Sequence, residues 1–193
     1  MEFDVSKLSV QDSYLRMVQL ISPRPIAWVS TLSIDGIPNL APYSFFTGVG
    51  VNPPTICFSP ANDGQGRPKD TLENIRQTGQ FVVNIVTEPV AQAMHRTSDE
   101  LAPEVNEFAL AGVDPAASTQ VKPPRVRSAV AAMECTLHSA IQLGAGPGGA
   151  NLVIGYVVHL HIDDDLVDQS SIETVGRVGR REYTVVKDTF RLE

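Results

Sequence analysis

The feature that most constrains the fold is a series of short β-type segments that follow one another without long helices between them. Residues 25–34 (PIAWVSTLSI) are rich in β-branched and aromatic residues, and Asp35-Gly36 is typical of a tight hairpin turn. A return strand is expected over residues 37–46, and a third strand over residues 55–59. Strands connected in this way pair with their neighbours in an antiparallel sheet.

A change to helical spacing interrupts this series after residue 69. Leu72 and Ile75 share one face of a predicted helix. Asp70 is its expected N-cap, Glu73 lies three residues on as in a capping box, and Gly79 is expected to end it. One short amphipathic helix therefore packs against the predicted sheet.

The rest of the chain returns mainly to strand-like patterns. These are residues 80–86, 126–143, 151–162 and a last strand over 182–192, with a second short helix near 89–95 and a surface excursion over 97–124. Since no helical crossovers separate the strands, the sequence predicts a mainly β fold whose antiparallel sheet closes into a barrel. No linker is visible, so residues 1–193 are predicted to form a single domain.

Composition excludes several classes of protein. The formal net charge of −7 disfavours nucleic acid and anionic lipid as partners. The N-terminal segment lacks the pattern of a signal peptide, and no apolar run is long enough to span a membrane. Cys57 and Cys135 lie far apart in apolar runs, as expected of buried thiols in a reducing cytoplasm.

Two motifs resemble functional signatures but fit ordinary structure better. Residues 144–149 match G-x-G-x-x-G, yet a strand-like run follows them instead of a helix, which favours a hairpin loop. His159, His161 and Asp163 alternate and could bind a metal. Because no further ligand is evident, a polar, solvent-facing strand side is favoured and no metal is predicted.

If the two histidines face solvent, the apolar residues that alternate with them are expected to face the core. These residues are Val158, Leu160 and Ile162. Nucleophilic catalysis is not indicated either, because the sequence has no G-x-S-x-G elbow and neither cysteine lies in a catalytic context.

The segment Arg67-Pro68-Lys69-Asp70-Thr71 has the composition of a phosphate site. It places two cations and a hydroxyl at the expected start of a helix, where unpaired backbone N–H groups and the helix dipole favour an anion. The segment also fits an ordinary capped helix with solvated cations, so both interpretations stay open on this evidence.

The stretch over residues 24–46 is the most distinctive of the chain. Hydroxyl side chains lie in its first strand, and Pro42 in the second indicates an edge or a bulge that leaves backbone groups free. A flavin ring needs such backbone partners together with apolar cover, which the aromatic residues could supply. On composition alone, however, these aromatics are better explained as core residues.

The ordered set of motifs resembles the flavin reductase-like family. The motifs are RPIAWVST, a D-G turn, NLAPYSFF, NPP, KDT before a short helix and FVVNI, followed by Asn106-Glu107-Phe108 and GRVG with Tyr183. The resemblance implies the FMN-binding split barrel, an antiparallel β-barrel with a few short helices, and a homodimer. It spans nearly the whole chain.

The resemblance also implies a set of flavin-binding residues. Ser30 and Thr31 match positions near the phosphate and ribityl chain, and Lys69 to Thr71 match the phosphate-binding helix start. The full implied set is Trp28, Val29, Ser30, Thr31, Ala41, Pro42, Tyr43, Ser44, Ser59, Pro60, Lys69, Asp70, Thr71, Arg177 and Tyr183. No catalytic side chain is implied, because the flavin itself carries the redox chemistry.

The function that the resemblance implies is transfer of hydride from NADH or NADPH to flavin. The reduced flavin then serves an acceptor or a partner monooxygenase. FMN is favoured over FAD because one phosphate cluster is visible. The alternatives are a flavoredoxin-like FMN electron carrier and a flavin-binding module without turnover; a relative of the pyridoxamine-phosphate oxidases is disfavoured by the RPIAWVST and NLAPYSFF motifs.

Overall fold

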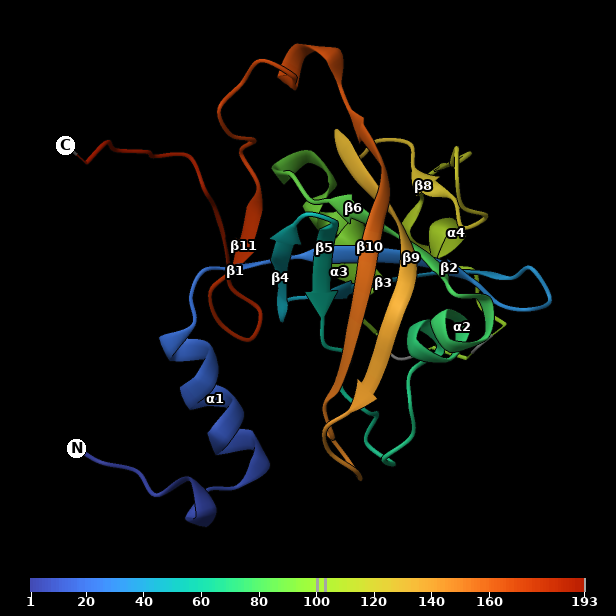
Figure 1. Cartoon of the computed structure of the whole chain (residues 1–193). Coiled ribbons are helices and arrows are strands. Elements are labelled where there is room, and N and C mark those ends of the chain that lie inside the picture. Colours follow the sequence, from blue (N-terminus) through green and yellow to red (C-terminus); the bar gives the residue numbers. More distant parts are fainter. Residues whose placement is uncertain (100, 103, 193) are drawn as a thin grey trace.

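The centre of the molecule is an antiparallel sheet. The computed structural model describes residues 1–99, 101–102 and 104–192, and within them this sheet has seven strands in the order β3-β2-β6-β9-β10-β5-β4 (Figure 1). Their bounds are β2 Ala27–Leu32, β3 Pro38–Tyr43, β4 Phe46–Val51, β5 Pro54–Phe58, β6 Gln80–Ile85, β9 Ala131–Gln142 and β10 Asn151–Ile162.

Smaller elements surround this sheet. β1 (Arg24–Pro25), β11 (Val175–Arg177) and β12 (Tyr183–Val185) form a three-stranded sheet, and β7 (Pro115–Ala116) pairs with β8 (Arg125–Val126). The α-helices are α1 Val10–Leu20, α2 Asp70–Thr78, α3 Ala91–Arg96 and α4 Glu107–Ala111, and the 3-10 turns are η1 Val5–Lys7, η2 Glu88–Val90 and η3 Asp164–Leu166. Among the described residues, no helix is long and apolar enough to cross a bilayer.

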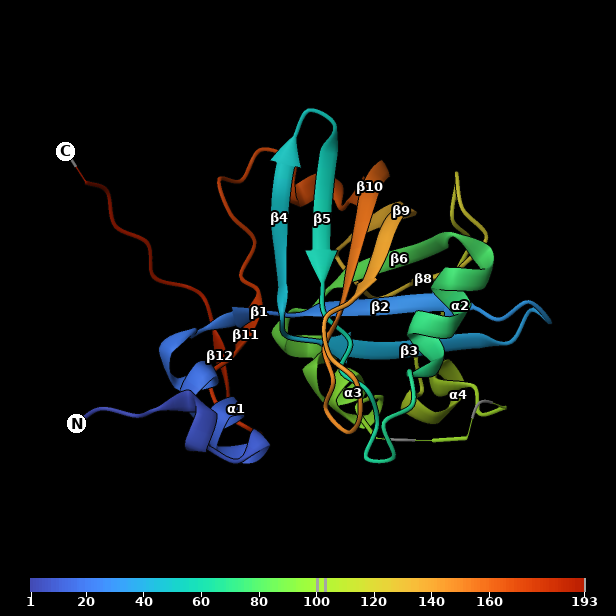
Figure 2. The same cartoon turned by 60° about the horizontal axis from the view of Figure 1, so that its bottom comes forward.

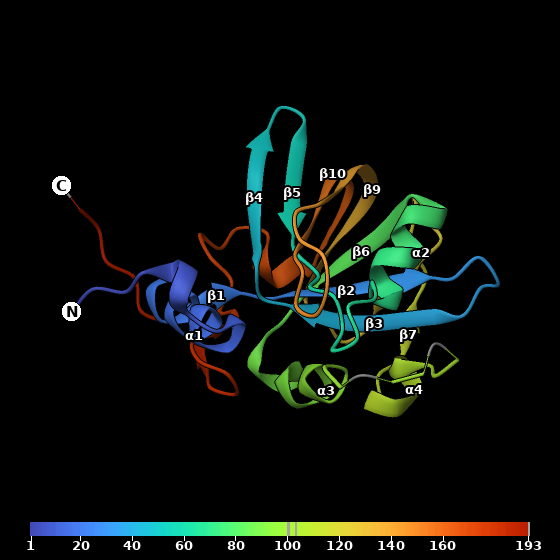
Figure 3. The same ribbon diagram turned by 90° about the horizontal axis from the view of Figure 1, so that it is seen from below.

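Strand β2 divides two hydrophobic cores. Alternate side chains of a strand point to opposite faces, so Val29 packs with Leu72 of α2, while Trp28 packs with Met94 of α3 and Phe108 of α4. In Figure 3, α2 accordingly lies on one side of β2 and β3, and α3 and α4 lie on the other. Both faces of this strand pair are thus covered.

The expected fold class is confirmed, but the sheet is not closed by hydrogen bonds. β3 and β4 are the two end strands, and no ladder joins them within the described part of the chain. The hairpin of β4 and β5 stands away from β2 and β3 (Figures 2 and 3), because β4 pairs only with β5. β4 itself was not expected as a separate strand.

The start of α2 differs from the prediction by one residue. Lys69 is the N-cap and Asp70 is the first helical residue, and the Lys69 side chain makes no capping hydrogen bond. Gly79 ends the helix in the left-handed conformation, as predicted. No side chain of the described residues caps α2, so the backbone N–H groups of Asp70 and Thr71, which precede the first hydrogen bonds of the helix, have no capping partner.

The prediction for the end of β10 is wrong. His159 and His161 are half-buried, whereas the alternating apolar residues are exposed, at 43% for Val158, 58% for Leu160 and 44% for Ile162. The cause is a β-bulge between Val157 and His159, which shifts the alternation of the strand. The sequence gives no local signal for this bulge.

Buried Arg24 joins three segments that are distant in sequence. Its guanidinium donates to the carbonyl oxygens of Val18 at 3.1 Å, Ile21 at 3.2 Å and Gly179 at 3.1 Å, and to Oγ of Ser44 at 3.3 Å. α1 was not foreseen in the sequence, and Arg24 connects the last turn of this helix to the sheet and to the C-terminal loop.

Replacing this guanidinium should loosen that junction. Arg24→Lys retains the charge but loses the planar fork of donors, so buried carbonyl groups lose partners and we expect a cost of roughly 1–3 kcal/mol. Urea denaturation measures the free energy of unfolding. Arg16→Lys is the matched control, because exposed Arg16 contacts the side chain of Gln19 and the ring of Phe3 and reaches no buried carbonyl group among the described residues. Equal stability of the two variants would contradict the role given to Arg24.

Candidate flavin-binding site

A cavity of about 500 Å³ opens between β3, the start of α2 and the segment that follows α3. Its size lies within the range of small-molecule sites. The residues that line it are Asn39, Ala41, Pro42, Tyr43, Asp63, Arg67, Pro68, Lys69, Asp70, Thr71, Thr97, Ser98, Asp99, Leu101 and Glu107.

The N-terminus of α2 forms one wall of this cavity. Backbone N–H groups of Leu72 and Glu73 donate to the carbonyl oxygen of Lys69, so the helix begins at the cavity edge. Arg67 precedes it and is held by an ion pair to Asp63 at 2.8 Å. Helix dipole, outward amides and two cations together make this wall suited to an anion.

A buried amide lies at the base of the cavity. Asn39 donates through Nδ2 to Oε1 of Glu107 at 2.8 Å, and its Oδ1 accepts from Thr71 at 2.7 Å and from Thr31 at 3.3 Å. Asn74 of α2 donates to Thr31 at 3.0 Å. This network connects β2, β3, α2 and α4, and it fixes the orientation of the Asn39 amide.

The network also limits what Thr71 can offer to a ligand. Its hydroxyl hydrogen is directed to Oδ1 of Asn39, so the oxygen faces the cavity only as an acceptor. A phosphate oxygen is itself an acceptor. A phosphate at this wall would therefore be bound by the backbone N–H groups of the helix start and by Lys69.

The three residues Asn106, Glu107 and Phe108 each have a distinct role. Asn106 caps α4, because its Oδ1 accepts from the backbone of Phe108 at 3.0 Å and of Ala109 at 3.4 Å. Glu107 bonds Asn39 and the backbone N–H of Leu40, at 3.2 Å. Phe108 enters the core below Trp28. The motif thus builds a short helix that delivers a carboxylate to the cavity.

Burial shifts the acid–base groups of the cavity. Removal from water raises the pKa of Glu107 and of Asp70, since it penalises the charged carboxylate. It also raises the pKa of Tyr43, whose buried hydroxyl has no hydrogen-bond partner among the described residues. The lining carries more carboxylates than cations, so an anionic ligand must rely on the local groups of the α2 wall.

Part of the predicted flavin set comes together in this cavity. Six of its members line it: Ala41, Pro42, Tyr43, Lys69, Asp70 and Thr71. Thr31 lies one layer behind, bonded to Asn39. Trp28 lies in the core, and its indole N–H donates to Thr97 of the cavity wall at 2.9 Å.

The other predicted residues lie elsewhere. Val29 is in the core beneath α2. Ser30 points to the opposite face of β2 and donates to the carbonyl oxygen of Pro124 at 2.5 Å. The Ser44 hydroxyl accepts a hydrogen bond from Arg24, and the Ser59 backbone N–H donates to the carbonyl oxygen of Phe45. The Pro60 carbonyl oxygen accepts from Asn151. In the C-terminal part, Arg177 donates to the carbonyl oxygen of Arg180, and the Tyr183 hydroxyl lies 3.0 Å from Nδ1 of His95.

Sequence reasoning missed several lining residues. Asn39 and Glu107 each lie inside a recognised motif, NLAPY and N-E-F, but nothing in the sequence indicates that they meet. Thr97, Ser98, Asp99 and Leu101 belong to the segment expected to run over the surface. Only the packing of α3 and α4 against β3 brings these parts to one cavity.

Comparison with known proteins agrees with this geometry. The family model described as "Flavin reductase like domain" matches residues 20–176. The chain belongs to this flavin reductase-like family. An uncharacterized protein of Aquifex aeolicus (strain VF5) is 36% identical over 189 residues, which cover 95% of this chain and 94% of the relative.

Two solved structures show how far the likeness to this family extends. Nitrilotriacetate monooxygenase component B from Bacillus cereus is 32% identical with a TM-score of 0.94, over 100% of this chain and 98% of that one. The 2-nitrobenzoate 2-nitroreductase NbaA of Pseudomonas fluorescens is 30% identical with a TM-score of 0.89, over 100% and 95%. The flavin reductase-like fold therefore extends over the described chain.

The residues of the cavity fit a flavin mononucleotide. The α2 wall provides amides and cations for one phosphate, and the cavity volume is of the size that a flavin needs. The unpartnered Tyr43 hydroxyl is the kind of buried polar atom that a ligand satisfies.

The raised pKa of Glu107 predicts a pH dependence of folding. The folded state holds a proton on Glu107 more tightly than the unfolded chain, whose value is near 4.5, so this residue's contribution to stability is lost as pH rises through its folded pKa. Glu107→Gln removes this titration. The difference in unfolding free energy between wild type and variant should therefore decrease as pH rises above about 4.5.

Urea denaturation at a series of pH values measures this difference. Exposed Glu88→Gln serves as the control, and its difference from wild type should not follow that trend. A difference for Glu107→Gln that stays constant or increases with pH would contradict the raised pKa.

Proposed function

We propose that this protein is an NAD(P)H-dependent flavin oxidoreductase that binds FMN in the cavity beside α2. The observation that carries the proposal is the α2 wall, where an uncapped helix start, Lys69 and Arg67 supply one anion site. One such wall fits the single phosphate of FMN. Membership of the flavin reductase-like family supports the reaction class.

The chain's own residues would bind and orient the cofactor. FMN, when bound, supplies hydride acceptance and electron transfer at its ring. The backbone and side chains of Ala41, Pro42 and Tyr43 would line the ring, and the α2 wall would hold the phosphate. Glu107 would support them from behind, because its carboxylate fixes the orientation of the Asn39 amide.

We also propose that the protein is a cytoplasmic homodimer. Its reduced flavin would pass electrons to an acceptor or would be used by a partner monooxygenase. Exposed apolar residues support self-association, since Val49 and Val51 of the projecting β4–β5 hairpin are 57% and 89% exposed. Light scattering after gel filtration measures the mass. A monomer at micromolar concentration would contradict the dimer.

The reaction is tested by steady-state oxidation of NADH and NADPH with and without added FMN. We expect turnover that requires flavin. Flavin that stays bound through gel filtration, without turnover from either nicotinamide, would instead support a flavoredoxin-like electron carrier. Bound flavin that neither a nicotinamide nor a reduced protein donor can reduce would support a non-catalytic flavin-binding module.

The phosphate assignment predicts the effect of removing Lys69. Lys69→Ala should weaken FMN binding by at least about tenfold, because a charge-assisted contact to the phosphate is lost. Quenching of flavin fluorescence measures the affinity. Riboflavin, which lacks the phosphate, should bind wild type and variant alike.

Lys187→Ala is the matched control. Lys187 is exposed and pairs loosely with Glu88 and Glu173, at 3.8 and 3.9 Å. FMN affinity that is equal in the Lys69 and Lys187 variants would remove the phosphate assignment.

A further inference from the structure

A β-bulge brings two histidines to the same sheet face as a buried glutamate. Across the two long strands, Val157 pairs with Cys135 and His159 pairs with Glu134, with the register shift between Val157 and His159. Cys135 and Glu134 are neighbours and point to opposite faces, so His159 points to the opposite face from Val157. Val158 is the extra residue that makes this possible.

The glutamate is held rigidly at the centre of this face. The loop above β9 donates three backbone N–H groups to the Glu134 carboxylate, from Thr119 at 2.7 Å, Gln120 at 2.6 Å and Val121 at 3.1 Å. Burial would raise the pKa of Glu134, but the hydrogen bonds from His161 and this loop outweigh it and lower the pKa to about 2. The three backbone donors hold the carboxylate in one orientation.

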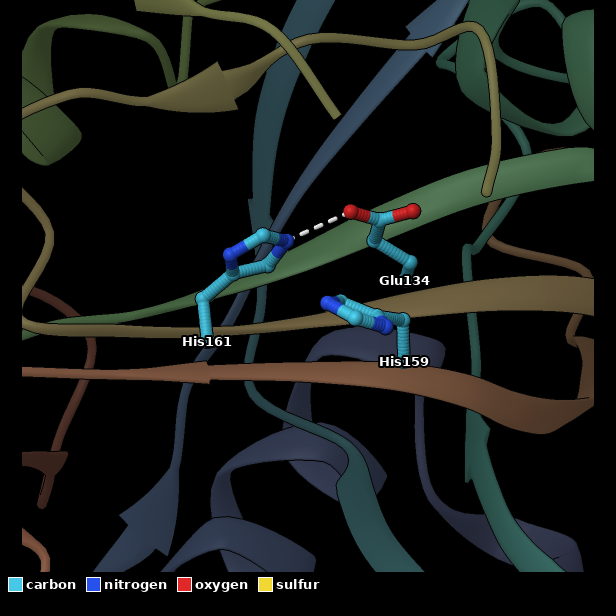
Figure 4. Close-up of side chains that lie close together, drawn as sticks. All are labelled: Glu134, His159 and His161. Carbon is cyan, nitrogen blue, oxygen red and sulfur yellow. Dashed lines mark hydrogen bonds and ion pairs between the residues drawn. The ribbon is translucent and has the colours of Figure 1, made fainter. Parts of the chain in front are cut away.

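His161 and His159 differ in their hydrogen-bond partners. Nε2 of His161 lies 2.5 Å from Oε1 of Glu134, which explains its position as a partner of the buried charge. His159 makes no hydrogen bond to any described residue, and its half-buried ring lies 4.8 Å from that of His161. Figure 4 shows the His161 imidazole bonded to the carboxylate and the His159 ring lying beside the pair. The contact to Glu134 accounts for His161, whereas no contact to a polar group among the described residues accounts for His159.

We propose that Glu134, His159 and His161 bind a divalent transition-metal ion of the Zn²⁺ type. One ligand atom from each residue lies within 4.8 Å of the others. Two imidazoles and a carboxylate are a ligand set that such ions prefer, and three protein ligands leave a position for water. Metal–ligand distances of roughly 2.0–2.2 Å require that the His161 ring moves away from the carboxylate oxygen, to let the ion in between, and that the His159 ring moves closer.

The bound ion would replace the contact between His161 and Glu134 and engage His159 as well. The three backbone N–H groups would remain as outer contacts that orient the carboxylate. The ion would thereby join β9, β10 and the loop over residues 119–121. Because the ion would bind the folded chain and not the unfolded chain, it would stabilise the folded state.

The test is a zinc titration of the full-length protein without a tag, stripped of metal by a chelator. Competition with a chromogenic chelator should give one Zn²⁺ per chain, and Zn²⁺ should raise the melting temperature. Co²⁺ should give visible absorption typical of a site with nitrogen and oxygen ligands. FMN binding is measured separately and should not depend on the metal, so this proposal can fail or hold independently of the proposed function.

His159→Ala is the deciding variant, since it removes no hydrogen bond among the described residues. It should melt like wild type without metal and bind Zn²⁺ at least about tenfold more weakly, and His161→Ala should also lose binding. His138→Ala is the control, because His138 is exposed on β9 and lies outside the cluster. The absence of a one-to-one zinc site, or an affinity unchanged in His159→Ala, would overturn the proposal.

Discussion

The hydrogen bond between Asn39 and Glu107 is the contact on which the site depends. It joins β3 to α4, and through Oδ1 of Asn39 it reaches Thr71 at the start of α2. These elements lie on opposite sides of the β2–β3 pair, so one buried amide couples the two layers that enclose the cavity. A buried amide that lacked these partners would cost free energy, which makes the arrangement specific as well as stabilising.

This coupling has a consequence for ligand binding. Because Thr71 gives its hydroxyl hydrogen to Asn39, the α2 wall acts on an anion through backbone N–H groups and nearby cations. Burial raises the pKa of two carboxyl groups of the cavity, Glu107 on the side of α4 and Asp70 at the start of α2 itself. A carboxyl group thus lies on the same wall as the cations, so a phosphate there would rely on the backbone N–H groups of the helix start, Lys69 and Arg67.

The sequence predicts local structure better than it predicts long-range contacts. The D-G turn, the helix that Gly79 ends and the hairpin loop at residues 144–149 depend on neighbouring residues, and all three are found as expected. The meeting of Asn39 with Glu107 depends on packing between distant segments. The exposed side of β10 was predicted wrongly because the bulge at Val158 interrupts the two-residue alternation of the strand. No residue type near Val158 indicates this bulge in the sequence.

The central claim is that flavin binds at the start of α2. Amide hydrogen exchange of the full-length protein, with and without saturating FMN, tests it most directly. The account predicts that FMN slows exchange in residues 69–73 and 39–43, because the phosphate would engage the helix amides and the ring would cover the strand. Unchanged exchange in both segments, with protection only in residues 175–185, would contradict the assignment and place the flavin near Arg177 and Tyr183.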